Sequence, residues 1–417
     1  MKTCPICGST VEPVVPFGRM PLANGFLRQE DFRSEYFFDL ALGFCERCAM
    51  AQLIENVPPE RMFHAQYPFF TASSARMAAH FQKWAQQVTR ERLSPDGSFV
   101  VEIGSNDGTF LQHFAAAGVR HLGVEPSANV AAVAQGQGIP TLCRFFDEAA
   151  AKDIVQGHGQ ADVVLAANCF CHIWNLHALA ASLQILLKPG GAVIFEDPYM
   201  GDIIEKTAYD QIYDEHIYYF SVASVTHWLS QHGFEIVDVQ PQPVHGGSMR
   251  YVVSRCGERN ASPRVDAQRR KETGMGLQRP ETYSQFGLRV ESSRDELLRL
   301  LRGIKAEGRR VVGYAATSKS TTVLNYCGIS TGLLEFISDT TPMKQGKFSP
   351  GMHIPIRSQQ DFEADYPGYA LLFAWNHAEE IFQKERAFEQ AGGQWITYVP
   401  RVGILGKTHP GRSHAAI

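Results

Sequence analysis

A buried strand that turns at once into a glycine-rich loop and then a helix limits this chain to few folds. The stretch is VVEIGSNDGTF, residues 100–110. β-Branched residues precede the loop and Phe-Leu-Gln-His-Phe follows it, which is typical of a strand and then a helix. Gly104 and Gly108 let the backbone approach a ligand closely, and Asn106 can adopt a left-handed conformation. Glu125 follows the next apolar stretch, where an acidic side chain is placed to bind ribose hydroxyls. The pattern predicts a nucleotide-type site.

The loop lacks the full G-x-G-x-x-G spacing, so a dinucleotide pyrophosphate is not the expected ligand. The E-x-G-x-x-x-G turn with its distant glutamate resembles motif I and the acidic loop of the S-adenosylmethionine-dependent methyltransferases. Other nucleotide-binding Rossmann-like loops share the signal, and a glycine-rich turn without a ligand is the simplest alternative. The cofactor-binding residues that we predict are Gly104, Asn106, Asp107, Gly108, Glu125, Pro126 and Asn168.

Length and charge exclude several classes of protein. A chain of 417 residues is expected to form two or three domains. The net charge of −4 and a sequence pI near 6.4 give no basic face for nucleic acid. Met1 leads directly into Lys2-Thr3-Cys4, and no apolar run is long enough to span a bilayer. We therefore expect a soluble, cytoplasmic monomer that binds neither nucleic acid nor membrane.

Two C-x-x-C knuckles lie about forty residues apart, at Cys4/Cys7 and Cys45/Cys48. Two such pairs complete the tetrahedral four-sulfur shell that Zn²⁺ accepts in structural sites. Such a shell leaves no open position, so the predicted site is structural; a redox pair is the alternative. The segment between the knuckles is too small to form its own core and needs the metal.

The region from residue 100 to about 255 alternates strands and helices, which predicts a doubly wound, mostly parallel sheet. The expected strands are Phe99–Ile103, His121–Val124, Thr141–Cys143, Ala161–Ala166 and Gly191–Glu196, with a turn at Lys188–Gly191. Ligands bind at the carboxyl ends of such strands. This places Asn168 and His172, after the fourth strand, among the site candidates.

Residues 208–220 crowd polar and aromatic side chains without a helical or strand period. His216 would supply a base, Glu215 a carboxylate to tune it, and Tyr213 a hydroxyl for an oxyanion. A surface turn packed by aromatic rings is the alternative. His172 is a competing base, and Tyr67 precedes a helix expected after Ser74, where an interface-packing role is equally plausible. His216, Glu215, Tyr213 and His172 are the catalytic candidates that the residues themselves suggest.

A second alternating region begins at residue 309, after a charged connector and a helix expected from Ser292 to Ala306. Strands at Val311–Ala315, Leu334–Ser338 and Tyr369–Ala374 predict a smaller Rossmann-like domain. Its small-residue loop at 317–321 can hold a phosphate on backbone N–H groups with Lys319 as counter-charge. The predicted substrate-binding residues are Arg250, Thr317, Lys319, Ser320, Asn376 and His377. A purely structural lobe is the alternative.

The order of these motifs over nearly the whole chain resembles the nucleotide-sugar C-methyltransferases that build branched deoxysugars, of the C-3′-methyltransferase type. The motifs are EIGSNDG, DEH after EDPY, VHGGSMRY, GYAATSKS and LLFAWNHAEEI, after the four-cysteine module. The resemblance implies an α/β fold with a zinc-binding module (1–66), a class I methyltransferase domain (67–260) and a Rossmann-like nucleotide-sugar domain (261–417). It also implies methyl transfer from S-adenosylmethionine to a carbon beside a keto group of a nucleotide-linked deoxysugar, commonly a thymidine diphosphate sugar.

That chemistry needs a base, because a carbon next to a ketone becomes nucleophilic only after it loses a proton, and it needs donors for the enolate oxygen. The resemblance implies that His216 is the base, with Glu215, Tyr213, Tyr67 and His172 around the reaction centre. Two other classes fit the motifs less well: a small-molecule O- or N-methyltransferase with an added lobe, and a non-catalytic nucleotide-sugar-binding protein.

Overall fold

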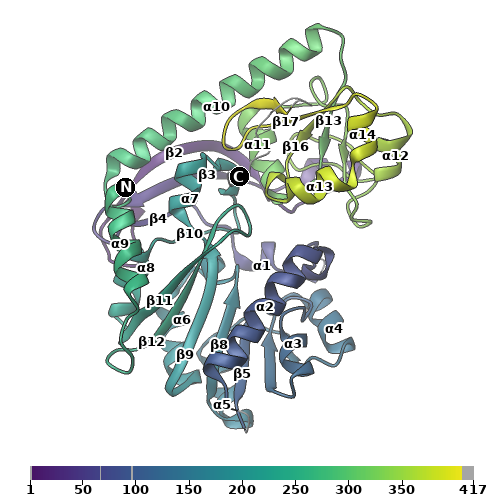
Figure 1. The fold of residues 1–417 in the computed structure, drawn as a ribbon. Helices are drawn as coiled ribbons and strands as arrows, with labels where there is room; N and C mark the ends of the chain where they lie inside the picture. Colours follow the sequence, from purple (N-terminus) through teal and green to yellow (C-terminus); the bar gives the residue numbers. More distant parts are fainter. Residues whose placement is uncertain (1, 66, 95–96, 406–417) are drawn as a thin grey trace.

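The chain forms three β-sheets in a computed structural model that describes residues 2–65, 67–94 and 97–405 (Figure 1). The N-terminal sheet has five strands in the order β1-β2-β3-β4-β10, all antiparallel. Its strands are β1 (Lys2–Thr3), β2 (Thr10–Pro21), β3 (Phe37–Cys45), β4 (Met50–Leu53) and β10 (Tyr218–Tyr219). The short helix α1 (Pro59–Met62) follows β4. The last strand of this sheet therefore comes from a segment some 165 residues later in the sequence, directly after His216.

The middle sheet has seven strands in the order β11-β12-β9-β8-β5-β6-β7. They are β5 (Phe99–Ile103), β6 (Arg120–Val124), β7 (Thr141–Leu142), β8 (Ala161–Ala167), β9 (Leu187–Pro198), β11 (Phe234–Gln242) and β12 (Ser248–Arg255). The strands from β9 through β8, β5 and β6 to β7 pair in parallel, and β12 and β11 add an antiparallel edge. The predicted doubly wound sheet is confirmed.

Helices cover both faces of this sheet because successive side chains of a strand point to opposite faces. Val100 belongs to the apolar cluster that includes residues of α2 and α3, whereas Val101 belongs to the cluster that includes residues of α5, α6 and α8. The helices of this part are α2 (Ala75–Arg92), α3 (Leu111–Ala116), α4 (Ala128–Gly136), α5 (Glu148–His158), α6 (Leu176–Leu186), α7 (Met200–Lys206) and α8 (Val222–Ser230). Helix α2 starts directly after Ser74, as the sequence predicted, and Ser74 caps it by accepting a hydrogen bond from the Met77 N–H.

Strand β9 begins four residues before the predicted Gly191. Ala161 of β8 pairs with Leu187 and Val163 pairs with Ala192, so residues 188–191 are extra chain on the β9 side. Gly190 takes a positive φ of 75° there. The turn that the sequence predicted at this position is therefore an irregularity inside the strand.

The C-terminal sheet has six strands in the order β15-β14-β13-β16-β17-β18, all parallel except for the last pair. They are β13 (Val311–Tyr314), β14 (Ile337–Ser338), β15 (Ile356–Arg357), β16 (Tyr369–Leu372), β17 (Gln394–Thr397) and β18 (Gly403–Leu405). Its helices are α11 (Ser318–Cys327), α12 (Gln359–Ala364), α13 (Ala378–Lys384) and α14 (Arg386–Gln390). The predicted Rossmann-like lobe is present; residues 406–417 of the predicted third domain lie outside the described residues.

Two helices, α9 (Pro263–Met275) and α10 (Pro280–Ala306), connect the middle and C-terminal sheets. Helix α10 starts twelve residues before the predicted Ser292. Its buried face repeats every three or four residues, from Tyr283 to Ile304, although the surrounding composition is charged. The Tyr283 ring stacks on Phe44 of β3 at 3.9 Å, and Figure 1 shows α10 running past β2 towards the C-terminal lobe. The helix therefore packs against the N-terminal sheet as well as against the C-terminal lobe. Within the part of the chain that the structure describes, no helix has the length and apolar character needed to cross a membrane.

Candidate active site

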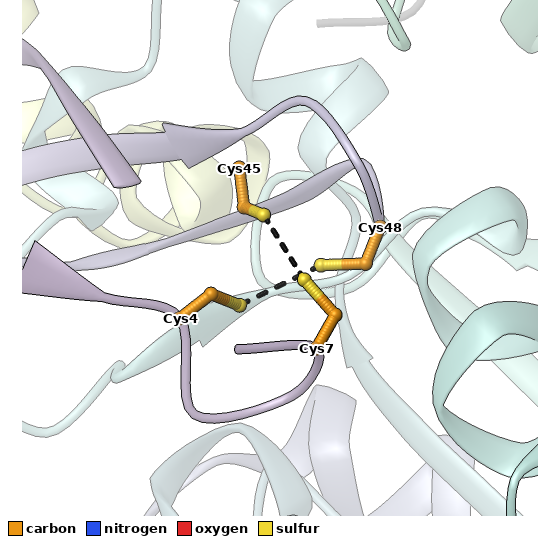
Figure 2. Close-up of side chains that lie close together, drawn as sticks. All are labelled: Cys4, Cys7, Cys45 and Cys48. Carbon is orange, nitrogen blue, oxygen red and sulfur yellow. Dashed lines mark hydrogen bonds between the residues drawn. The ribbon is translucent and has the colours of Figure 1, made fainter. Parts of the chain in front are cut away.

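Four cysteine thiols meet where the β1–β2 turn lies against the β3–β4 turn (Figure 2). The Sγ atoms of Cys4 and Cys48 are 3.6 Å apart and those of Cys7 and Cys45 are 3.4 Å apart. Thiolates 2.3 Å from a tetrahedral Zn²⁺ lie roughly 3.8 Å from one another, so the set fits this ion with little adjustment. Three of the four side chains are buried, and no coordination position is left for a substrate. The cluster is a structural zinc site.

A cavity of about 1710 Å³ lies at the carboxyl ends of the middle strands and is also lined by the N-terminal module and the C-terminal lobe. Its lining contains all five predicted catalytic residues, five of the seven predicted cofactor residues and four of the six predicted substrate residues. The four that do not line it are Asp107, Gly108, Arg250 and Ser320. Its volume is large enough for two ligands of nucleotide size.

The β5–α3 loop forms one end of this cavity, and its backbone is shaped as the sequence predicted. Gly104 and Asn106 have φ values of +74° and +47°. A Cβ added at Gly104 would lie 2.7 Å from the Cys169 Sγ, so only glycine fits. The Glu125 carboxylate accepts hydrogen bonds from the backbone N–H groups of Asn106 (3.0 Å) and Ser127 (2.8 Å). Glu125 therefore fixes the loop and still faces the cavity.

Burial gives this end of the cavity its electrostatic character. Burial raises the pKa of Glu125, which is 5% exposed. Within the described part of the chain, the Oε2 atom of Glu102 and the Oδ1 atom of Asn168 are buried without a hydrogen-bond partner. Buried acceptors of this kind are usually satisfied, so they indicate a ligand that donates to them. The residues present fit a cofactor with ribose hydroxyls and an amino group.

Asp107 and Gly108 support the loop from behind. The Asp107 carboxylate accepts from the Ala72 N–H at 2.8 Å and from the Thr109 hydroxyl at 2.6 Å. A Cβ on Gly108 would approach the Ala134 Cβ of α4 to 3.1 Å. Together with the Thr71 N–H, which donates to Asn106 Oδ1 at 3.0 Å, these contacts hold the segment before α2 over the loop.

Glu215 is bound by two side chains from distant parts of the chain. Tyr67 Oη donates to its Oε2 at 3.1 Å and Asn24 Nδ2 donates to its Oε1 at 2.6 Å. Burial raises the pKa of Glu215 to about 7. The prediction that Glu215 tunes His216 is wrong, because neither hydrogen bond of the imidazole involves this carboxylate and the two side chains bind different partners.

The His216 imidazole is held in one tautomer. Its Nδ1 lies 2.8 Å from the Gln211 carbonyl oxygen, which can only accept, so Nδ1 carries the proton. Nε2 is then the acceptor for the Tyr213 hydroxyl at 2.8 Å. Burial, followed by the nearby His172, lowers the pKa of His216 well below its ordinary value. The ring is neutral near pH 7 and offers a lone pair at Nε2.

His172 lies beside His216, with ring centroids 5.3 Å apart. Its Nε2 is buried without a hydrogen-bond partner in residues 2–65, 67–94 and 97–405, and burial lowers its pKa to about 4. Both histidines therefore line the cavity as neutral rings. Gln211, which the sequence did not single out, is buried there too, and neither of its side-chain amide atoms has a partner among the described residues.

The C-terminal lobe closes the other end of the cavity with Lys319 at its centre. Lys319 Nζ donates to Asn376 Oδ1 at 3.0 Å and lies 5.0 Å from the centre of the Trp375 ring. Burial lowers its pKa to about 8, although Asp210 opposes this shift. Thr317 and His377 share the wall, whereas Ser320 turns its hydroxyl to the Thr317 carbonyl oxygen at 2.6 Å. His245 also lines this wall, with a buried and unpartnered Nε2.

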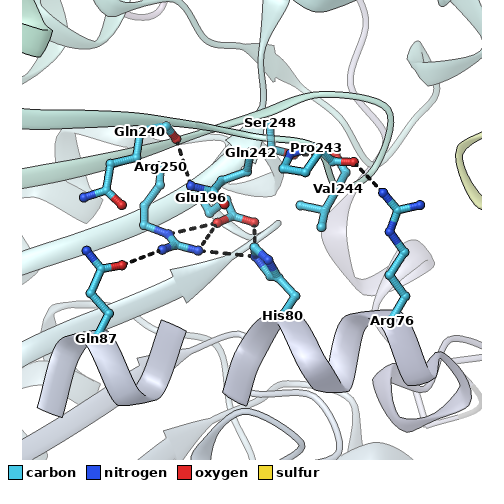
Figure 3. Close-up of polar contacts among 10 residues, drawn as sticks. All are labelled: Arg76, His80, Gln87, Glu196, Gln240, Gln242, Pro243, Val244, Ser248 and Arg250. Carbon is cyan, nitrogen blue, oxygen red and sulfur yellow. Dashed lines mark hydrogen bonds and ion pairs between the residues drawn. The ribbon is translucent and has the colours of Figure 1, made fainter. Parts of the chain in front are cut away.

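Arg250 lies away from the cavity lining, and the expectation that it meets a phosphate needs correction. Its Nε and Nη2 donate to Glu196 Oε2 at 3.0 and 2.8 Å, and its guanidinium stacks over Trp84 at 4.0 Å. His80 of α2 binds the other Glu196 oxygen at 2.8 Å (Figure 3). The sequence alone suggested that Arg250 is a free cation. Its partner Glu196 lies 54 residues away, and only the register of β9 with β12 brings the two residues together. The group anchors α2 to the sheet.

The loop after β13 repeats the hydrogen bonds of the loop after β5. The Asp339 carboxylate, just beyond β14, accepts from the backbone N–H groups of Ala316 and Thr341, both at 2.7 Å. Ala315 takes a positive φ of 70°, as Asn106 does in the other loop. Asp339 lines the cavity, and the sequence pattern that marked Glu125, an acid after the second strand, also marks this residue.

Comparisons with known proteins agree over the whole chain. Residues 4–63 match a family model described as "Putative zinc binding domain", residues 77–239 a methyltransferase domain and residues 243–400 the C-methyltransferase C-terminal domain. The chain is 34% identical over 405 residues to the C-methyltransferase NovU of Streptomyces niveus. The aligned residues cover 96% of each protein.

More distant relatives match less than half of the chain. An uncharacterized methyltransferase of Mycobacterium leprae (strain TN) is 30% identical over 154 residues, 36% of this chain and 55% of that protein. The solved structure of the glycopeptide N-methyltransferase MtfA with S-adenosylmethionine covers 42% of this chain and 93% of its own at 14% identity, with a TM-score of 0.33. Because the full-length relative and all three family models agree, the chain belongs to the S-adenosylmethionine-dependent C-methyltransferases.

Proposed function

We propose that this enzyme methylates a ring carbon next to the keto group of a nucleotide-linked deoxysugar, with a thymidine diphosphate sugar as the first candidate. One observation carries the proposal: two loops with the same carboxylate-to-backbone hydrogen bonds, at Glu125 and at Asp339, open into one cavity. A carboxylate after the second strand of such a unit suits a ribose. The cofactor uses one loop, which leaves the other for a substrate that carries a nucleoside.

The polar groups between the two loops suit a diphosphate and a sugar. The cavity wall near the N-terminus of α11 carries three polar side chains, those of Lys319, Asn376 and His377. A helix N-terminus favours an anion. Gln211 and His245 offer unpartnered polar atoms nearer the reaction centre. A simple apolar methyl acceptor would leave these groups unsatisfied.

In the proposed reaction His216 removes the proton from the sugar carbon. Its Nδ1–H is fixed on the Gln211 carbonyl oxygen, so Nε2 presents the lone pair once the Tyr213 hydroxyl turns away. The hydroxyls of Tyr213 and Tyr67 then donate to the enolate oxygen. Gly104, Asn106, Glu125 and Asn168 would hold S-adenosylmethionine, which supplies the methyl group. The low pKa of His216 keeps the base unprotonated and ready at neutral pH.

Replacing Glu125 with alanine should weaken S-adenosylmethionine binding by about 1.5 to 3 kcal/mol, because a charge-assisted acceptor is lost. Calorimetric titration gives the dissociation constant directly. Glu148→Ala, which removes an exposed carboxylate of α5, is the matched control and should leave the constant unchanged. A parent-like affinity in Glu125→Ala would show that this carboxylate does not hold the ribose.

Replacing Lys319 with methionine should weaken sugar-nucleotide binding by about tenfold to a hundredfold, while S-adenosylmethionine affinity stays as in the parent. The Lys319 pKa of about 8 adds a pH test. The ammonium is charged below that pH and neutral above it, so parent affinity should fall as the pH rises through 8. The Met variant should lack this fall, and Lys305→Met, an exposed change on α10, should keep it.

The decisive test incubates the enzyme with a panel of nucleotide keto-sugars and S-adenosylmethionine carrying a labelled methyl group, with products read by mass spectrometry. We expect a labelled methyl on a carbon beside the keto group, which is restored when the enolate carbon takes the methyl. Label on oxygen or nitrogen, or none with any keto-sugar while a non-nucleotide acceptor is methylated, would contradict the proposed substrate class.

A further inference from the structure

A second group of metal-binding side chains, distinct from the four-cysteine cluster, combines the cavity-lining His172 and His216 with the buried Cys171. Cys171 Sγ and ring nitrogens of His172 and His216 all lie within 4.8 Å of one another. Cys171 and His172 are neighbours in the 3₁₀ turn Phe170–His172, and the Ile217 N–H donates to the Cys171 carbonyl oxygen at 2.9 Å. That backbone hydrogen bond fixes the turn against the segment that carries His216.

The lone pairs that a metal needs are present on these groups. His172 Nε2 is buried and has no hydrogen-bond partner among the residues that the structure describes. His216 carries its proton on Nδ1, so its Nε2 is an acceptor, and among the described residues its hydrogen bond comes from the rotatable Tyr213 hydroxyl. Both rings line the cavity, so an ion can reach them from there. Binding to Cys171 would release the thiol proton to solvent.

The ligand set selects the class of ion. One sulfur and two imidazole nitrogens suit Zn²⁺ and related borderline cations, whereas Mg²⁺ and Ca²⁺ prefer oxygen. Three protein ligands leave a fourth position for a further ligand, and two of the three, His172 and His216, line the cavity. This arrangement differs from the closed four-sulfur site, so an ion would bind less tightly and exchange with solution.

We propose that Cys171, His172 and His216 form a second, exchangeable site for a zinc-class cation. An ion there takes the Nε2 lone pair of His216 and fills space next to the substrate. The site stands on the geometry alone; its consequence, inhibition by excess zinc, rests on the proposed function of His216 as the base. Zinc in excess of one equivalent should then inhibit, and a mild chelator should restore the activity.

The test titrates Zn²⁺ by calorimetry into full-length protein that already holds one equivalent. We expect a second equivalent in the parent and in Cys256→Ser, which removes an exposed thiol. In Cys171→Ser and in His172→Gln the affinity for this second ion should fall by about tenfold or more. Circular dichroism shows whether each variant is folded. Because two different ligands are replaced, the test still works if one of the variants does not fold.

The possible results test the second zinc site and the role of His216 as the base separately. A single equivalent in the parent, or an unchanged second equivalent in both variants, would overturn the proposal. If the second zinc ion binds the parent and not the variants, the site is supported. If that ion also fails to inhibit the parent, the result speaks against His216 as the base.

Discussion

Asparagine at position 216 is expected to lower turnover by about a hundredfold or more, with both ligands still bound. The amide keeps much of the shape of imidazole and can still donate to the Gln211 carbonyl oxygen. It cannot accept a proton from carbon. The loss should therefore fall on kcat, and the dissociation constants of S-adenosylmethionine and the sugar nucleotide should change little. Steady-state kinetics with calorimetry separates the two effects.

His172 is the competing base, because its free Nε2 lies in the same wall. Deuterium wash-in separates the two assignments, since it measures proton removal without methyl transfer. We expect His216→Asn to stop exchange of the sugar proton and His172→Asn to retain it. If His216→Asn exchanges at the parent rate and His172→Asn does not, the base is His172.

Serine at position 45 is expected to abolish stoichiometric zinc binding and to lower the free energy of unfolding by several kcal/mol. Cys45 is fully buried at the end of β3, and its side chain completes the four-sulfur shell. Loss of the metal removes the link between the two turns of a module with little core of its own. Metal analysis and thermal unfolding check both effects. Cys256→Ser is the matched control, because that thiol is exposed.

The zinc variant should also lose activity, for a reason that the sheet order supplies. Strand β4 pairs with Tyr218 and Tyr219, and the Leu53 N–H donates to the Ile217 carbonyl oxygen at 2.8 Å. The chain on one side of His216 is thus an extension of the zinc module. A Cys45→Ser protein that keeps its zinc, its melting temperature and its kcat would show that the four thiols are not a structural site.

Local patterns were enough to predict the parts of the fold that local chemistry decides. Asn106 takes the left-handed conformation that its side chain tolerates, and Ser74 caps α2. The buried parallel strands appear as apolar runs because both of their faces are covered. Helix α10 was predicted too short. In its first half the buried face consists of isolated apolar residues such as Tyr283 within a charged stretch, so the helical period is hard to detect in the sequence. The predicted domain boundaries remain predictions.

The candidate site was predicted as a set of residues but not as a set of contacts. Glu215 was expected beside His216, yet its carboxylate binds Asn24, 191 positions earlier. Arg250 was expected at a phosphate, yet Glu196 neutralises it. Pairings between distant segments leave no periodic trace in the sequence, so these partners could only be found in the folded chain. Gln211 and His245 were overlooked for the same reason.

The turn at Ala23 and Asn24 bears on any attempt to redesign the substrate range. The Ala23 N–H donates to Asp214 at 2.8 Å, and the Ala23 carbonyl oxygen accepts from Thr321 of α11 at 2.8 Å. Asn24 contacts both Glu215 and the Ser318 hydroxyl. A chimaera that imports only the C-terminal lobe of a relative would place a foreign α11 against this turn and so disturb the catalytic segment. Exchanged lobes should therefore bring residues 23 and 24 of their own parent with them.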